Sequence, residues 1–429
     1  MLEILEEKQA NYTQRITMNH LFYNAFIILA LLSTASVRAQ VTIGSDNPPN
    51  KGAMLDLKEY EDGTALSGGR NAARGMMMPR IRLTDLNSMS DLSIPANEYL
   101  EHTGLVVYNL NQCLDYGVTD SKGLYVWDGK KWIRLGKKSQ SPEVFEFVDN
   151  RDPANPETYL YRKFGDAGTW MLENMRAKIY QQGGAPPTLG IVTPPSADPI
   201  QKLYAYPGLS GNGTSTTYFD MLPEIGLLYN FAAVTNNENI AVPARVNQGQ
   251  VVGAVPGPNE VENAVASGRV QGICPNGWHV PSDREWNMLE KELATYPEKY
   301  STNSGTYWDP AWETGETNRG NGTYGDTMKT PCLPPGMSGS AIGKSFPASQ
   351  GGFNLYLTGF GSADSGALIN YGGYAYLRTS SSSADTSSSS ESVNVRASYH
   401  RSLGEVNAYV GRIFSFQNNL MTVRCKKND

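Results

Sequence analysis

Four cysteines are the residues of this chain with the clearest capacity for covalent or metal chemistry. They are Cys113, Cys274, Cys332 and Cys425. Cysteines that bind metals usually stand in C-x-x-C pairs or beside histidines, whereas the nearest two here are 58 positions apart. Four cysteines allow three pairings, and the residues themselves do not choose among them. We therefore expect at least one disulfide and no metal site at these positions.

Other catalytic arrangements have little support. The chain has four histidines and no G-x-S-x-G, H-E-x-x-H or phosphate-loop motif. Asp149, Asp152 and Glu157 fall close together in a proline-rich loop and could bind a cation, although acids in loops are more often solvated. We expect no catalytic residues, no metal and no cofactor, and hence a protein that is not an enzyme.

Aromatic side chains in polar segments are the candidates for ligand binding. Five such residues are Tyr307, Trp308, Trp312, Tyr374 and Tyr376. Aromatic faces stack on the apolar faces of sugars, and neighbouring Asn, Ser and Thr side chains can bond to hydroxyls. The same rings could instead pack the interiors of their own loops. These residues therefore predict either a sugar-binding surface or local loop cores.

The composition is typical of a loop-rich exported protein. The chain has 429 residues, enough for two or three domains, and its apolar content of 40% is sufficient for packed cores. Lys and Arg number 36 against 42 Asp and Glu, giving a net charge of −6 without any basic block. We expect no nucleic-acid partner, because binding to a phosphate backbone requires clustered positive charge.

An apolar segment near the start predicts secretion. Residues 21–35 are apolar and precede small side chains at Val37 and Ala39, which is the pattern of a signal peptide over 1–39. A membrane span needs about 20 apolar residues, and this run is shorter. We expect cleavage near Ala39, a secreted or outer-surface location, no transmembrane span in the mature form and cysteines in an oxidising compartment. The start codon, Met1 or Met18, stays open.

Two folded regions are expected after the signal. Residues 40–136 contain short β-prone runs and form a small β-rich module, residues 137–144 form a polar linker, and residues 145–429 form a second domain with long loops. A serine-rich stretch at 380–390 cannot bury a core and is expected to be an exposed loop. Residues 420–425 predict a last strand.

Two local elements in these regions are specified in more detail. Asp128-Gly129 predicts a two-residue hairpin turn that puts Tyr125 opposite Trp132, and the apolar run at 104–109 is typical of a strand covered on both faces. Ser282 and Glu285 form a capping-box pattern at the start of a helix. One face of that helix carries apolar residues at helical spacing: Trp286, Leu289, Leu293 and Tyr296.

Four blocks of residues in the second domain occur in a recognisable order. They are W-M-L-E-N-M at 170–175, G-L-L-Y-N-F-A at 226–232, C-P-N-G-W-H-V-P-S-D-R-E-W at 274–286 and T-V-R-C at 422–425. Together they resemble the Fibrobacter succinogenes major paralogous domain of secreted Bacteroidetes proteins. The likeness departs at 374–380, where members usually carry two adjacent tryptophans. Residues 41–136 contain V-T-I-G, then A-M-L-D-L at 53–57, G-M-M-M-P-R at 75–80 and the Trp127/Trp132 hairpin. With these motifs they are similar to a module at the front of many Bacteroidetes surface proteins.

The resemblance implies an α+β, C-type-lectin-like C-terminal domain, because the third block is similar to the strand-to-helix motif of formylglycine-generating enzymes. In that fold the two ends of the domain pair in one sheet, and a cysteine near the first helix meets one in the last strand. Cys274 and Cys425 fit this arrangement, while the pairing of Cys113 and Cys332 stays open. We interpret four residues of the third block as structural: Trp278, Ser282, Glu285 and Trp286.

Three functions follow from these observations. We favour an exported binding or adhesion protein that recognises a glycan, another surface polymer or a surface protein. Calcium is not expected, because the E-P-N, Q-P-D and W-N-D runs of calcium-binding lectins are missing. The alternative is a structural or assembly subunit of a fimbria-associated appendage, with a homo-oligomer formed through the front module. An oxidase of the formylglycine-generating type is less favoured, since Cys332 and Cys425 lie 93 residues apart.

Overall fold

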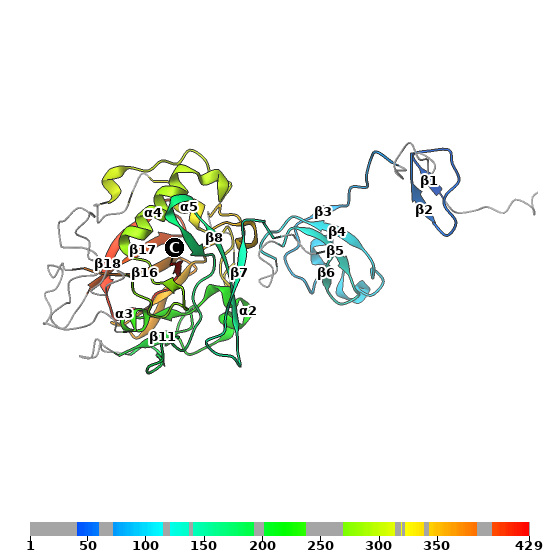
Figure 1. Cartoon of the computed structure of the whole chain (residues 1–429). Helices are drawn as coiled ribbons and strands as arrows, with labels where there is room; N and C mark the ends of the chain where they lie inside the picture. The colour runs from blue at the N-terminus through cyan, green and yellow to red at the C-terminus, as the bar shows by residue number, and fades with distance from the viewer. Residues whose placement is uncertain are drawn as a thin grey trace, which may run out of the picture. The chain divides into compact units, whose positions relative to one another are not determined.

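The structure is a computed structural model of the chain (Figure 1). It describes residues 41–59, 72–114, 121–136, 140–192, 201–236, 269–313, 319, 322–338, 343–383 and 397–428. The signal peptide expected at 1–39 lies outside these residues, as do positions 384–390 of the serine-rich stretch. The start of that stretch is not the expected exposed loop, because Ser380 and Ser381 are buried in a strand that spans Tyr374–Ser383. The described part divides into two compact units, residues 1–78 and 79–429.

The first unit contains a two-stranded parallel sheet. Strand β1 (Val41–Ile43) pairs with β2 (Leu55–Leu57), with Val41 opposite Leu55 and Ile43 opposite Leu57. Side chains alternate between the two faces of a strand, so these four residues share one face. All four are exposed. The described part of the unit therefore presents an apolar face to solvent.

The second unit begins with a four-stranded sheet in the order β3-β4-β5-β6. Its strands are β3 (Arg80–Ile81), β4 (Val106–Asn109), β5 (Gly123–Trp127) and β6 (Trp132–Arg134). Two short 3-10 helices precede β4, at Ser90–Leu92 and Ala96–Glu98. A small core lies on one face of the sheet and consists of Leu83, Met89, Val107, Tyr125, Trp127 and Trp132.

The hairpin between β5 and β6 differs from the expected register. Trp127, not Tyr125, lies opposite Trp132, and Tyr125 lies opposite Arg134. The Asp128 carboxylate accepts the N–H groups of Lys130 and Lys131, and the Asp128 N–H donates to the Lys131 carbonyl at 3.0 Å. These bonds centre the turn one residue later than predicted. Each β5 residue is therefore paired with the β6 residue two positions later than expected. Because side chains alternate between faces with a period of two, the same side chains still face the core.

The remainder of the second unit contains three sheets. The first has the order β13-β19-β9-β8-β7 and consists of β7 (Phe145–Asp149), β8 (Glu157–Lys163), β9 (Thr169–Met171), β13 (Trp278–His279) and β19 (Lys426–Lys427). The second has the order β15-β14-β16-β17-β18 and consists of β14 (Thr358–Ser362), β15 (Ala367–Tyr371), β16 (Tyr374–Ser383), β17 (Ala397–Gly404) and β18 (Gly411–Phe416). The third consists of β10 (Thr188–Leu189), β11 (Leu203–Ala205) and β12 (Leu228–Tyr229).

Within the described ranges, helices are few and mostly short. They are α2 (Thr217–Met221), α3 (Phe231–Thr235), α4 (Asp283–Thr295) and α5 (Gly325–Met328). Further 3-10 turns lie at Gly165–Ala167, Pro223–Ile225, Pro297–Lys299, Pro310–Glu313 and Ala348–Gln350. The fold is therefore β-rich. No helix of the described residues is both long enough and apolar enough to cross a membrane.

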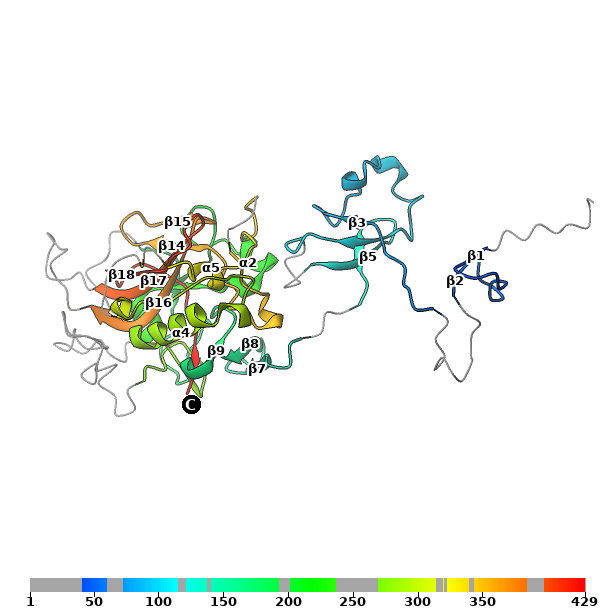
Figure 2. The same cartoon turned by 90° about the horizontal axis from the view of Figure 1, so that it is seen from above.

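The expected helix at the third block is α4, and its predicted capping box is present. The Ser282 hydroxyl accepts the Glu285 N–H at 3.3 Å, and the Glu285 carboxylate accepts the Ser282 N–H at 3.0 Å. Trp286, Leu289 and Leu293 are buried in the main core, where they meet residues of β9, β16 and β17. Figure 2 shows α4 beside β16. Tyr296 lies just beyond the helix and is 42% exposed.

The chain end returns to the first sheet, and Figure 2 shows it near β9. Strand β19 lies between β9 and β13, and Cys425 just before it forms a disulfide with Cys274. The last strand is shorter and later than the predicted 420–425. Residues Leu420, Met421 and Thr422 instead make single bridges to three different segments, because the chain crosses from one sheet to another there.

The second disulfide joins Cys113 to Cys332. Cys113 follows β4 in the small sheet region, whereas Cys332 lies in the C-terminal region, 219 positions along the chain. Cys332 is buried in a small cluster with Leu222, Ile225 and Tyr356, against which Cys113 packs. A covalent bond thus ties the module to the C-terminal region.

Candidate ligand-binding site

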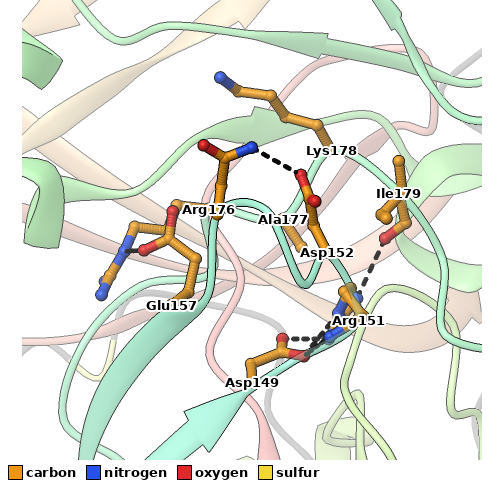
Figure 3. Close-up of a pocket in the computed structure, with 9 residues that line it drawn as sticks. Asp149, Arg151, Asp152, Glu157, Arg176, Ala177, Lys178 and Ile179 are labelled. Atoms are coloured by element: carbon orange, nitrogen blue, oxygen red, sulfur yellow. Dashed lines mark hydrogen bonds and ion pairs between the residues drawn. The ribbon is translucent and has the colours of Figure 1, made fainter.

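A pocket of about 310 Å³ lies at the turn between β7 and β8 (Figure 3). We call it the β7–β8 pocket. One wall is the hairpin loop that follows Asp149, and the other is the segment 176–179 that follows β9. Six charged residues line it: Asp149, Arg151, Asp152, Glu157, Arg176 and Lys178. Asn155, Ala177 and Ile179 complete the lining.

Arg151 fixes the base of the hairpin loop. Its guanidinium forms an ion pair with Asp149 at 2.7 Å and donates to the carbonyls of Ile179 and Ile273 at 3.1 and 2.7 Å. Both charged side chains are almost fully buried, so their opposite charges must compensate each other. The pair therefore forms a rigid wall of the pocket.

Arg176 holds the opposite wall in the same way. Its Nε lies 2.5 Å from a Glu157 oxygen, and a terminal nitrogen lies 2.8 Å from Glu173. The guanidinium also lies 4.3 Å from the centre of the Tyr159 ring. Burial opposes the charge of Arg176, but Tyr159, Glu173 and Glu157 outweigh burial and raise its pKa. Arg176 thus remains a cation whose charge is used inside the protein.

Asp152 has a different environment from the other two acids. One carboxylate oxygen accepts the Ala154 N–H at 3.1 Å, and the other accepts the Asn155 side-chain amide at 3.0 Å. The hydrogen bond from Asn155 lowers the pKa of Asp152, so the carboxylate is charged at neutral pH. In Figure 3 this carboxylate points toward Lys178 and away from Asp149.

Lys178 connects the pocket to a row of aromatic rings. Its ammonium lies 5.3 Å from the centre of the Tyr206 ring and 5.9 Å from that of Phe219. Tyr206 in turn makes edge-to-face contacts with Phe219 and Tyr204, at 5.3 and 6.0 Å between ring centres. Partial burial acts to lower the pKa of Lys178, but a hydrogen bond with Tyr206 raises it. Lys178 is therefore a cation at the pocket rim.

The charges of the pocket cancel in pairs. Three acids and three bases line it, so the formal sum is zero. Arg151 pairs with Asp149, and Arg176 pairs with both Glu157 and Glu173. Among the described residues no ion pair involves Asp152 or Lys178. A ligand would therefore meet one carboxylate and one ammonium beside charges that are already paired within the protein.

The acids that the sequence singled out as a cation site, Asp149, Asp152 and Glu157, do come together in this pocket. Two of them are occupied by arginines, which removes the negative charge that a divalent cation requires. The described residues contain no group of three or more His, Cys, Asp or Glu side chains that could hold a metal ion. The geometry thus favours a polar ligand over a cation.

Three of the aromatic residues predicted to bind a ligand lie together at the edge of the main core. The rings of Trp308 and Trp312 pack at 5.6 Å from each other, and both contact the buried Tyr324. Both are partly buried against the core. Tyr307 is 48% exposed and lies 5.4 Å from the Trp312 ring. The two tryptophans of this group therefore mainly pack against the main core.

Tyr374 and Tyr376 lie on β16 and stack on each other at 5.9 Å. Tyr376 is held by the Phe360 ring at 4.7 Å and by the Asn370 amide, which donates to its hydroxyl at 3.0 Å. Tyr374 is 36% exposed. No described contact joins these two tyrosines to the tryptophan group or to the β7–β8 pocket.

Sequence reasoning missed the basic half of the pocket. Arg176 and Lys178 closely follow the W-M-L-E-N-M block, which the sequence marks only as a family signature. A usable signal was present, because this block contains Glu173 and is followed by alternating basic residues on a segment without regular structure. What the sequence could not show is that this segment lies opposite the β7–β8 turn.

The residues of the four family blocks mainly build the interior. Trp170 and Trp286 pack edge to face at 5.0 Å, and both are fully buried. The Arg424 guanidinium donates to the Asn174 side chain at 2.8 Å, which joins the first block to the last. His279 lies 2.9 Å from Glu285, within the third block. The blocks thus mark a scaffold, and the pocket lies beside them.

These features define a β-rich protein with two disulfides and a scaffold formed by four separated sequence blocks. Residues 165–427 match the model of the Fibrobacter succinogenes major domain, which is more than half of the chain. The chain therefore belongs to this family, a surface-protein family of unclear function, and the resemblance found in the residues is confirmed. Residues 42–145 match a phage tail like trimerisation region. No curated protein and no solved structure matches the chain.

Proposed function

We propose that this chain is an exported surface protein that binds a neutral glycan, or another hydroxyl-rich surface polymer, in the β7–β8 pocket. The observation that carries the proposal is the charge arrangement of the pocket. Arg151 and Arg176 form ion pairs with acids of the protein itself. Among the charged residues that line the pocket, Asp152 and Lys178 are the two without a described ion-pair partner. The site is therefore built to make directed hydrogen bonds rather than to attract a net charge.

A sugar suits these two groups because each hydroxyl both donates and accepts hydrogen bonds. One hydroxyl can donate to the Asp152 carboxylate while its neighbour accepts from the Lys178 ammonium. The volume of about 310 Å³ lies at the lower end of the range for small-molecule clefts, so the pocket accommodates a short unit of a polymer. The rings of Tyr206 and Phe219 beside Lys178 extend the surface.

The proposal includes calcium-independent binding and no enzymatic activity. Calcium would need acidic oxygens that are free, whereas Asp149 and Glu157 are held by arginines. An oxidase of the formylglycine-generating type would need reactive thiols, and all four cysteines are in disulfides. The disulfides fit an extracellular location, and we propose signal peptide cleavage near Ala39 as the route to it.

We further propose that the C-terminal region is a variant of the α+β, C-type-lectin-like fold. Three features support this relation. Strand β19 at the chain end lies between β9 and β13, the Cys274–Cys425 disulfide joins the start of the third block to the end of the chain, and α4 follows β13 directly.

Binding of polysaccharides and glycans by the full secreted chain, on an array and by titration calorimetry, tests the proposed function. We expect D152A and K178A each to weaken binding at least tenfold. The matched control is D364N, which changes an exposed acid in the β14–β15 turn and should bind normally. Addition of a calcium chelator should change nothing. Binding that survives both pocket substitutions would contradict the site, and preference for amino acids or peptides would contradict the ligand class.

A second candidate function is that of an assembly subunit of a surface appendage, including a fimbria-associated one. The observation that favours it is the match of residues 42–145 to a phage tail like trimerisation region. The two functions are compatible, since a trimer would display three pockets and raise the apparent affinity for a repetitive polymer. Light scattering of the full secreted chain tests it, with three protomer masses as the expected result.

A further inference from the structure

The four-stranded sheet of the module has apolar side chains on both faces. The inner face carries Val107, Tyr125, Trp127 and Trp132, which are all buried. We call the opposite face the outer face, and its residues are Val106, Tyr108, Leu124, Val126, Ile133 and Leu135. The strand register brings them together, because Tyr108 lies opposite Leu124 and Val126 lies opposite Ile133.

The outer face is uncovered by the described part of this chain. Tyr108, Leu124 and Ile133 are 38%, 37% and 37% exposed, and Leu135 is 45% exposed. Val106 and Val126 are partly buried by their neighbours. These exposures hold within the unit 79–429, which includes the C-terminal region. The disulfide of Cys113 therefore ties the module to that region without covering this face.

Apolar strands of this kind are typical of sheets that are covered on both faces. Four large apolar side chains on this face are 37–45% exposed and adjoin one another, and contiguous exposed apolar patches mark contacts with other molecules. Covering it with a polar ligand would gain little, whereas the same face of a second copy is apolar and of equal size. A closed symmetric assembly supplies such a surface to every copy.

We propose that the outer face packs against the outer faces of two other copies of this chain, around the axis of a homotrimer. This inference rests on the second candidate function and names its contact surface. Two observations indicate that other copies of this chain cover the outer face. The face is apolar, so the same face of another copy can pack against it, and it lies within residues 42–145, which match a trimerisation region. Tyr108, Leu124 and Ile133 are at the centre of the contact.

The surface area that a stable interface must bury sets a further requirement. Stable interfaces bury about 800 Å² on each partner, more than one such sheet face provides. The strands β1 and β2 supply additional exposed apolar side chains on one face, namely Val41, Ile43, Leu55 and Leu57, and they lie within or beside the same matched region. The trimer therefore needs both apolar faces.

The test compares the mass of the full secreted chain with that of two variants, by size-exclusion chromatography with light scattering at about 10 µM. The variant L124E/I133E places carboxylates on the outer face and is expected to convert three protomer masses to one. The control L100E changes a residue of the same module that is 76% exposed and outside the outer face, and it should remain trimeric. Peptide mapping of the Cys113–Cys332 disulfide reports whether the module is folded.

A second measurement guards against misfolding of the charged variant. Benzoylphenylalanine at position 133 keeps the face apolar, and illumination should crosslink copies to one another, whereas the same probe at position 100 should not. A wild-type chain that is monomeric would overturn the assembly function together with this inference. A trimer that withstands L124E/I133E and gives no crosslink at 133 would overturn the outer face alone.

Discussion

The buried charges around α4 show how individual residues hold the C-terminal region together. Asp283 accepts bonds from Arg401 and Arg412, and Glu290 pairs with Arg401 and Arg319. All five side chains are almost inaccessible to water. Charges taken out of water are tolerated only when opposite charges and hydrogen bonds replace the lost hydration. The network therefore works as one unit, and the loss of any member leaves its partners uncompensated.

We predict that D283N lowers the free energy of unfolding by about 3–5 kcal/mol, because Arg401 and Arg412 would then be buried without the carboxylate that they share. Urea unfolding followed by tryptophan fluorescence measures the change. The control D364N removes a carboxylate of the same chemistry from the surface and should cost less than about 0.5 kcal/mol. Equal stability of the two variants would refute the role assigned to the network.

His400 makes the stability depend on pH. It is buried on β17, and burial, with help from the positive charges of Arg378 and Arg401, lowers its pKa to about 3 from an ordinary value of 6.5. The folded state thus resists protonation that the unfolded state accepts below pH 6.5. Stability should therefore be intact above that pH and decline as pH falls toward 3, on the order of 1 kcal/mol per unit.

The measurement is the urea midpoint at several pH values between 5 and 7.5, a range in which most carboxylates do not titrate. H400Q should flatten the decline. H102Q, which removes a histidine of the module, should leave the wild-type slope unchanged. A wild-type midpoint that is constant over this range would show that His400 is not enclosed as described.

At the level of elements, the sequence predicted local structure well and pairing poorly. The capping box of Ser282 and Glu285 is recognisable because its partners are three residues apart. The Asp128-Gly129 pattern predicts the β5–β6 turn one residue too early, because the bonds of the Asp128 carboxylate to Lys130 and Lys131 determine where the turn lies. The β7–β8 pocket could not be predicted in full, because Arg176 and Lys178 meet the β7–β8 turn only through the packing of the first sheet.

The cap of α4 gives a prediction at this scale. S282A removes the hydroxyl that accepts the Glu285 N–H, so we expect a loss of about 1 kcal/mol in the free energy of unfolding. Thr216 is the matched control, because it occupies the N-cap of α2 without a side-chain cap bond. T216A should therefore cost clearly less. Chemical denaturation of both variants provides the comparison, and similar losses would argue against a specific contribution of the cap.

The two disulfides have different roles in the whole molecule. Cys274–Cys425 closes the C-terminal region on itself, since it joins the start of the third block to the chain end next to β19. Cys113–Cys332 connects the module to that region across 219 positions. In the chain-entropy model each closure of such a long loop contributes about 5 kcal/mol. Only the Cys113–Cys332 disulfide joins the module to the C-terminal region. The expected linker at 137–144 connects the same two parts.

This difference predicts the outcome of cleavage in that linker. A protease site inserted at 137–139 and cut in the folded protein should leave two fragments that stay together on a non-reducing gel and separate after reduction. The variant C113S/C332S should release its fragments without reductant, because nothing covalent then crosses the cut. C274S/C425S, the matched control, should still hold its fragments together, although its C-terminal region should unfold at lower temperature. Fragments of the wild type that separate without reductant would show that Cys113 and Cys332 are not partners, and the covalent tether between module and domain would then be wrong.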